Sequence, residues 1–287
     1  MDIRRRTLVL LSAVAFVFLP AFAVALPSPA LAAAPPVPGS MASMGDSITR
    51  GFNACGFYLD CTSRSWSTGS SSSVNSHYLR LRAANPSLVA HNDAKSGATV
   101  ADMPGQAQKA VSQGVDYVTI LIGANDACAS SEDGMTSVAD FETRFRATID
   151  TLSTGLPEAS IFVASVPDLK RLWEVGKGNL AARTAWAALD ICQSMLARPR
   201  STDAADAARR DRVRQRVADY NTVLSQVCAE RPACRYDGGA VFGYPFALAD
   251  LSTWDYFHPN TNGQKILAEV TYAASFSLVS PDSLDDR

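Results

Sequence analysis

The chain has 287 residues, enough for one large domain or two small ones. Apolar residues make up 47% of it and charged residues 19%, which excludes a disordered or fibrous protein. The formal net charge is −2, so the chain lacks the basic surplus typical of proteins that bind nucleic acids.

The first 34 residues have the pattern of a secretory signal. Three arginines at positions 4–6 precede an apolar run over 8–26, and an Ala-x-Ala cleavage pattern follows at 30–32. We expect cleavage after Ala32, or alternatively after Ala34. The other interpretation is an uncleaved membrane anchor, since the run approaches the length of a span. Pro20 and the cleavage pattern favour removal, which predicts a secreted protein with no stable anchor.

Beyond the signal, short apolar runs alternate with segments of helical spacing. In chain order we expect a strand at 41–44, a Ser-rich loop at 62–73, a helix at 74–84, a strand at 88–90, a helix at 101–113, a strand at 115–122, a helix at 138–156, a strand at 159–166, a helical stretch over 169–228, a short strand at 234–236 and a helix at 261–276. This alternation is typical of an α/β fold with a parallel sheet covered on both faces. Residues 37–280 show no repeat or linker, so we expect one domain.

The Arg-rich run over 198–216 has two interpretations, a ligand patch or a solvated helix face. Asp203, Asp206 and Asp211 interrupt it, and Asp206 precedes Arg210 by four residues. That spacing is typical of ion pairs along an exposed helix, so the pattern favours a solvated face.

Six cysteines are present, and six allow fifteen pairings. Nearness in sequence suggests Cys55–Cys61 and Cys228–Cys234, which leaves Cys128–Cys192. A zinc site is the competing interpretation of clustered cysteines. No pair has the two-to-four-residue spacing that zinc sites use, so the pattern favours disulfides and agrees with export.

Polar, glycine-containing segments follow three of the expected strands. They are Gly-Asp-Ser-Ile-Thr at 45–49, a stretch through 92–99 that contains Gly97, and Gly-Ala-Asn-Asp at 123–126. A fourth polar cluster, Asp-Tyr-Phe-His-Pro-Asn at 255–260, precedes the last helix. Ligands of open α/β sheets bind beyond the carboxyl ends of the strands, so the four segments are expected to meet there.

Such a meeting supplies the parts of a serine hydrolase. Ser47 offers a hydroxyl on a tight turn, and it needs an adjacent base, for which His258 is the candidate. Asp255, three residues earlier, can hold one ring nitrogen and leave the other for Ser47. The backbone N–H groups of Ser47 and Gly97 and the Asn125 amide are candidate donors to an oxyanion.

Each of these residues also has a plainer interpretation. Asp46 and Asp126 resemble catalytic acids, but Asp at such positions usually accepts backbone hydrogen bonds and holds the turn. Asn125 could cap a helix. Asp255 and His258 could bind a metal, yet no cluster of further ligands accompanies them. The other two histidines, His77 and His91, are expected to be structural or surface residues, with His77 a candidate for the wall of the cleft.

Other hydrolase and cofactor motifs do not match. The Gly-x-Ser-x-Gly elbow is absent because Thr49 stands at its last position. The residues after Gly45-Asp46-Ser47 are not the two glycines of trypsin-like proteases. No phosphate-binding or dinucleotide fingerprint is present, so no nucleotide cofactor is implied.

The four segments, in this order, resemble the four blocks of the SGNH (GDSL) hydrolases over roughly residues 40–280. The cysteines and the run at 167–173 (PDLKRLW) look most like secreted actinobacterial esterases and lipases. The resemblance implies a three-layer α/β/α sandwich with a five-stranded parallel sheet. It implies Ser47 as nucleophile, His258 as base, Asp255 as triad acid, and Ser47, Gly97 and Asn125 as the oxyanion hole. Some members carry a cysteine before the second-block glycine, where this chain has Ala94-Lys95-Ser96, so the disulfide pairing cannot be copied from them.

The sequence therefore predicts a secreted serine esterase or lipase, working as a monomer on a small-molecule or lipid ester through an acyl-enzyme, with no metal or other cofactor. The first alternative is a carbohydrate O-acetylesterase with the same machinery. The second is a catalytically silent secreted binding protein, against which the intact Ser47, Asp255 and His258 argue. The aromatic residues of the loop 52–73 and the helical stretch 169–228 are expected to shape the pocket.

Overall fold

The computed structural model describes residues 37–275. The expected signal at 1–34 and the last expected helical residue, 276, lie outside this range. Five strands form one parallel sheet in the order β2-β1-β3-β4-β5. They are β1 (Ser40–Gly45), β2 (Val89–Asn92), β3 (Tyr117–Leu121), β4 (Ser160–Val163) and β5 (Cys234–Tyr236). The strands at the middle of the sheet are almost wholly buried, which explains their continuous apolar sequence.

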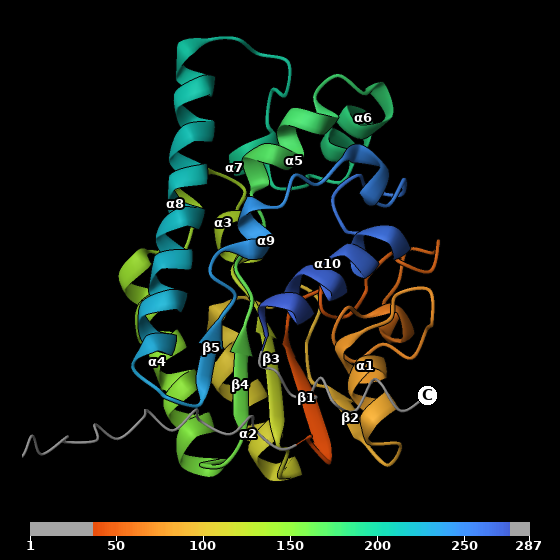
Figure 1. The fold of residues 1–287 in the computed structure, drawn as a ribbon. Helices are drawn as coiled ribbons and strands as arrows, with labels where there is room; N and C mark the ends of the chain where they lie inside the picture. The colour runs from red at the N-terminus through yellow and green to blue at the C-terminus, as the bar shows by residue number, and fades with distance from the viewer. Residues whose placement is uncertain (1–36, 276–287) are drawn as a thin grey trace, which may run out of the picture. The chain divides into compact units, whose positions relative to one another are not determined.

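Helices cover both faces of this sheet (Figure 1). On one face α2 (Met103–Gln113), α4 (Val138–Gly155) and α8 (Ala204–Ala229) pack side by side. On the other, α1 (His77–Ala84) and α10 (Thr261–Ala274) are joined by the imidazole of His77, whose Nε2 lies 2.8 Å from Thr271 Oγ1. The expected α/β/α sandwich with a five-stranded parallel sheet is confirmed. Within residues 37–275 no helix is both long and apolar enough to cross a membrane.

The expected helical stretch 169–228 is wrong as a single element. It contains four helices: α5 (Leu169–Gly176), α6 (Leu180–Ala188), α7 (Gln193–Leu196) and α8. Asn179 caps α6, and the backbone turns through positive φ at Asp190, Cys192 and Arg198, so the helical spacing does not continue. We call residues 169–203 the insert; Figure 1 shows it beyond the carboxyl ends of the strands.

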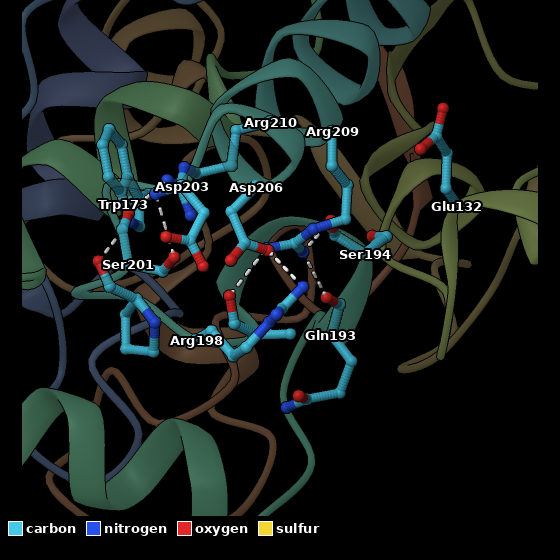
Figure 2. Close-up of polar contacts among 12 residues, drawn as sticks. Glu132, Trp173, Gln193, Ser194, Arg198, Ser201, Asp203, Asp206, Arg209 and Arg210 are labelled. Carbon is cyan, nitrogen blue, oxygen red and sulfur yellow. Dashed lines mark hydrogen bonds and ion pairs between the residues drawn. The ribbon is translucent and has the colours of Figure 1, made fainter.

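The Arg-rich run is also not simply a solvated face. Asp206 is fully buried and accepts from Arg198 and Arg209, at 2.7 and 3.3 Å, instead of pairing with Arg210. Arg209 also donates to the carbonyl oxygens of Gln193, Ser194 and Ala197 (Figure 2). The run therefore anchors the insert to α8 through the buried Asp206 and the Arg209 side chain, a role that charge spacing does not reveal.

The remaining differences concern element ends. Helix α1 begins at His77 instead of 74, because the Ser76 hydroxyl caps it by accepting from the Leu79 N–H. Strand β2 runs on to Asn92, so His91 lies within it. Strand β4 stops at Val163, and the Val166 N–H bonds the Asn221 side chain instead of a neighbouring strand. The loop 62–73 contains one short 3-10 helix, Thr62–Arg64, and α10 ends at Ala274. The short helices α3 (Ala124–Ala127), α9 (Ala240–Gly243), η2 (Val100–Asp102), η3 (Glu132–Gly134) and η4 (Leu248–Asp250) complete the described elements.

Candidate active site

Ser47 lies on the turn that leaves β1. Gly45 precedes it with φ +141°, and a side chain there would come within 2.2 Å of the Leu121 carbonyl oxygen, so only glycine fits. Gln106 of α2 bonds both backbone groups of Gly45, at 2.8 and 2.9 Å. Asp46 Oδ1 accepts from the Ile48 N–H at 2.8 Å, as expected for a turn residue. Together these contacts fix the backbone from which the Ser47 hydroxyl projects.

The structure brings Ser47, His258 and Asp255 into one hydrogen-bonded chain. Ser47 Oγ lies 2.8 Å from His258 Nε2, and His258 Nδ1 lies 2.6 Å from Asp255 Oδ2. With the proton on Nδ1, the imidazole donates to the carboxylate and presents Nε2 as an acceptor to the serine hydroxyl. This is the arrangement in which a base can take the proton of a nucleophile.

The Asp255 carboxylate is buried and well satisfied. Oδ1 accepts from the N–H groups of Phe257 and His258, at 2.9 and 3.1 Å. Oδ2 accepts from the Asn53 side chain at 2.6 Å as well as from the imidazole. Four donors therefore satisfy both oxygens of a carboxylate that is removed from solvent. Sequence reasoning missed Asn53, because no spacing rule links it to a partner 202 residues away.

The loop that carries His258 has a strained residue at its centre. Tyr256 has φ +54°, a conformation that costs a residue with a side chain about 1–2 kcal/mol. Its N–H donates to the Ser252 carbonyl at 2.8 Å, and its own carbonyl accepts from Trp186 Nε1 at 3.1 Å. Trp186 is buried on α6, so the insert holds the acid–base loop directly. Sequence analysis also missed this contact.

The candidate oxyanion donors flank Ser47 on both sides. Since β1 lies between β2 and β3, the loops that follow these three strands are neighbours. Gly97, after β2, has φ +80°, and a side chain there would meet nothing within 4 Å, so the space beside its backbone is open. Asn125, in α3, donates one amide hydrogen to the Ala98 carbonyl at 2.8 Å. An amide has two, so its second N–H remains for a ligand.

Two further carboxyl groups are buried beside these loops. Burial raises the pKa of Asp46 to about 7, and burial also raises the pKa of Asp126. Asp126 accepts from the Val100 N–H and from the Thr136 hydroxyl, at 3.0 and 2.8 Å. Both residues thus serve the backbone of the site, which is the plainer interpretation offered above.

The other two histidines lie elsewhere. His77 is fully buried, with Nδ1 3.0 Å from the Tyr117 hydroxyl, and burial lowers its pKa to about 3. It is a structural residue, and the suggestion that it lines the cleft is wrong. His91 lies on β2, a strand at the edge of the sheet. The described range 37–275 contains no group of three His, Cys, Asp or Glu placed to hold a metal ion.

The structure contains the disulfides Cys55–Cys61, Cys128–Cys192 and Cys228–Cys234. The second joins the end of α3, which carries Asn125, to the insert. Ser194 adds two hydrogen bonds across the same junction, to the carbonyls of Ala127 and Ala129, at 2.7 and 2.9 Å. The insert is therefore tied to the Asn125 loop at one end and, through Trp186, to the His258 loop at the other.

An apolar pocket lies against these loops. Ile48, Ala124, Phe257 and Pro259 line it, and each is a chain neighbour of Ser47, Asn125 or His258. Leu172 of α5 and Phe246 add to its wall. The lining is mostly hydrocarbon, with Asp168 and Arg171 as its charged members.

Several solved structures share this fold. One is LAE5, an alpha/beta hydrolase from the metagenome of Lake Arreo in Spain, at 22% identity and a TM-score of 0.52 over 84% of this chain and 96% of that one. A variant of the acetyl-xylooligosaccharide esterase Axe2 from Geobacillus stearothermophilus has 18% identity and a TM-score of 0.52 over 84% and 96%. An extracellular lipase from Streptomyces rimosus has 18% identity and a TM-score of 0.50 over 82% and 99%. These similarities show the fold.

The family assignment comes from the sequence. No curated protein matches the chain in a sequence search. The model of the family described as GDSL-like lipase/acylhydrolase matches residues 41–271, which include the Ser47 turn, the Asn125 loop and the Asp255–His258 loop. The chain therefore belongs to the GDSL-like lipase/acylhydrolase family and is a carboxylic ester hydrolase.

Proposed function

We propose that the protein is a secreted serine esterase or lipase that works through an acyl-enzyme on Ser47. The observation that carries the proposal is the continuous hydrogen-bonded chain from Ser47 Oγ through His258 to Asp255. The export signal at 1–32 and the three disulfides support secretion, because disulfides persist in oxidising compartments. Residues 37–280 are proposed as the single catalytic domain.

In the first half of the reaction, His258 Nε2 takes the Ser47 proton as Oγ bonds the ester carbonyl carbon. The carbonyl π pair moves to oxygen, and the N–H groups of Ser47 and Gly97 and the free Asn125 N–H donate to that oxyanion. Asp255 stabilises the imidazolium without taking its proton. The oxyanion then collapses, the bond to the alcohol oxygen breaks, and His258 gives that oxygen its proton.

In the second half, a water molecule takes the place of the alcohol. His258 removes one water proton as the oxygen attacks the acyl carbon, and a second oxyanion forms at the same donors. Its collapse breaks the bond to Ser47 Oγ, which recovers a proton from His258. The carboxylic acid leaves, and every group returns to its starting state.

The apolar pocket supports an acyl chain longer than acetyl. Esters of p-nitrophenol with acyl chains of two to sixteen carbons, measured beside acetylated xylan, test this. An optimum above four carbons agrees with the proposal, and activity confined to acetyl groups supports the carbohydrate O-acetylesterase instead. A protein that hydrolyses none of these esters would instead support the catalytically silent binding protein.

One pair of variants tests the pocket itself. Ala247 lines it and is exposed, so a bulky side chain there narrows its entrance. Ala247→Trp should shift the optimum to shorter chains. Ala249 is also exposed, lies two residues away and does not line the pocket, so Ala249→Trp is the matched control. An unchanged chain-length profile in Ala247→Trp would show that the acyl chain binds elsewhere.

A further inference from the structure

Some of the large hydrophobic side chains that face solvent lie beside the candidate active site. In the range 37–275, seven large hydrophobic residues have more than a third of their surface exposed. Four of them are Phe57 (63% exposed), Tyr58 (53%), Leu59 (51%) and Trp254 (51%). Single exposed apolar residues are ordinary, whereas a contiguous group marks an interaction site. We call these four residues the rim.

The rim is held in its exposed position. The Cys55–Cys61 disulfide closes the loop that carries Phe57, Tyr58 and Leu59. Just before this loop, the Asn53 N–H donates to the Leu59 carbonyl at 3.0 Å. Trp254 Nε1 donates to the Gly56 carbonyl at 2.9 Å, which joins the second loop of the rim to the first. The disulfide and these two hydrogen bonds fix the backbone of both loops, so the apolar side chains remain exposed to solvent.

The rim is continuous with the catalytic histidine. The Tyr58 ring packs on Phe52 with centroids 5.1 Å apart, and Phe52 packs on His258 at 4.9 Å. The residue after Trp254 is Asp255. An ester that reaches Ser47 past the His258 ring therefore crosses the surface that the rim borders.

The chemistry of the rim favours hydrocarbon. Residues 51–59 and 251–254 contain no charged side chain. Phe57 and Leu59 have no polar group, and the Trp254 indole N–H is already bonded to Gly56, so it is not available to a sugar hydroxyl. Aromatic and leucine side chains on a rigid protrusion suit the boundary between head groups and acyl chains.

We propose that the rim inserts into the surface of lipid aggregates and places Ser47 at that surface, so that the substrates are esters of aggregated lipids. This inference rests on the proposed esterase function, which it deepens by naming the substrate class. The occupant is the lipid surface, and a polysaccharide is the alternative that the experiment detects.

The binding test uses the mature Ser47→Ala protein and phosphatidylcholine vesicles, so that hydrolysis plays no part. In this background, the Phe57→Ser, Leu59→Ser double variant should partition to vesicles roughly 10- to 100-fold less well than the parent. This is the effect expected from removing two apolar side chains that become partly buried in the lipid surface on binding. The matched control is Leu180→Ser, Leu189→Ser, which removes two exposed leucines of the insert, 71% and 46% exposed. The control should bind as the parent does.

The kinetic test uses the same substitutions with Ser47 intact. The rim variant should keep its kcat/KM on monomeric p-nitrophenyl butyrate and lose activity on emulsified long-chain esters. Equal vesicle binding by the rim variant and its control would overturn the proposal. The proposal would also be overturned if the rim variant lost binding to insoluble xylan while its vesicle binding stayed unchanged, because the rim would then bind a polysaccharide. A protein that hydrolyses neither p-nitrophenyl butyrate nor the emulsified esters, but whose rim variant still loses vesicle binding, would refute the proposed esterase function. Binding of the rim to a lipid surface would then remain supported.

Discussion

Replacing Trp186 by Phe tests whether the insert positions the acid–base loop. The substitution keeps an aromatic ring and removes the N–H that bonds the Tyr256 carbonyl at 3.1 Å. Such a bond contributes about 1 kcal/mol. Tyr256 already holds a conformation that costs about 1–2 kcal/mol, so losing this bond removes one of the contacts that keep the strained loop in place. His258 then spends less time in line with Ser47.

The expected result is a fall in kcat of about 5-fold, the rate equivalent of about 1 kcal/mol, with KM little changed. Trp186 does not line the apolar pocket, so the effect is expected on the reacting geometry. The matched control is Trp173→Phe, which removes an indole bond of 2.9 Å to the Pro199 carbonyl within the same insert and away from the His258 loop. It should cost stability without lowering kcat.

The assay is steady-state kinetics on p-nitrophenyl butyrate, together with urea unfolding of each variant. A second variant, Tyr256→Gly, approaches the loop from the other side, since glycine adopts positive φ without strain. In the Trp186→Phe background it should recover part of the lost kcat. Equal losses of kcat in the two tryptophan variants, or unchanged kcat in Trp186→Phe, would refute the positioning role.

Three further predictions concern the disulfides, the buried histidine and the order of the triad. The Cys128→Ser, Cys192→Ser double variant should lose about 4 kcal/mol of unfolding free energy and about 10²-fold in kcat, because this bridge closes a long loop and holds Asn125. Loss of the Cys228–Cys234 bridge, which closes a short loop, should cost about 2 kcal/mol and leave kcat unchanged. An unchanged kcat in the folded Cys128→Ser, Cys192→Ser variant would contradict this prediction. Because burial lowers the pKa of His77 to about 3, the unfolded chain binds a proton below pH 6.5 that the native state refuses. The free energy of unfolding should therefore decrease as the pH is lowered, by about 2 kcal/mol more between pH 6.5 and 5 than that of the His77→Gln variant. Urea unfolding of both proteins across this range measures it, and parallel pH profiles would contradict the assignment. His258→Ala should lower kcat as much as loss of Ser47, Asp255→Ala should lower it less, and His91→Ala should leave it unchanged; an essential His91 would overturn the choice of base.

The fold was predictable because its strong signals are local. The run at 115–122 is apolar and β-branched, and the segment 117–121 of it forms the buried strand β3. The glycine-containing turns after β1, β2 and β3 could be assigned to one edge of the sheet, because parallel strands end together. The meeting of Ser47 and His258, whose Oγ and Nε2 atoms lie 2.8 Å apart, followed from that placement and from the scarcity of histidine.

The parts that escaped prediction depend on tertiary contacts. Asn53 and Trp186 bond residues far along the chain, and neither belongs to a motif. Some of the breaks within 169–203 occur at Asp190, Cys192 and Arg198. These residues adopt positive φ although they are not glycine, so the sequence gives no sign of the turns. Arg209 is spaced like a surface residue, and only the packed structure shows the carbonyls that it bonds.

The central claim is that Ser47 is the nucleophile, and the most direct test is covalent. The mature protein and its Ser47→Ala variant are incubated with a p-nitrophenyl alkylphosphonate, and the labelled peptide is mapped by mass spectrometry beside steady-state kinetics. We expect one phosphonyl group per chain, carried by Ser47, and a loss of about 10⁴-fold or more in kcat in the folded variant. Labelling of another residue, or more than a few per cent of activity in a clean Ser47→Ala preparation, would contradict it.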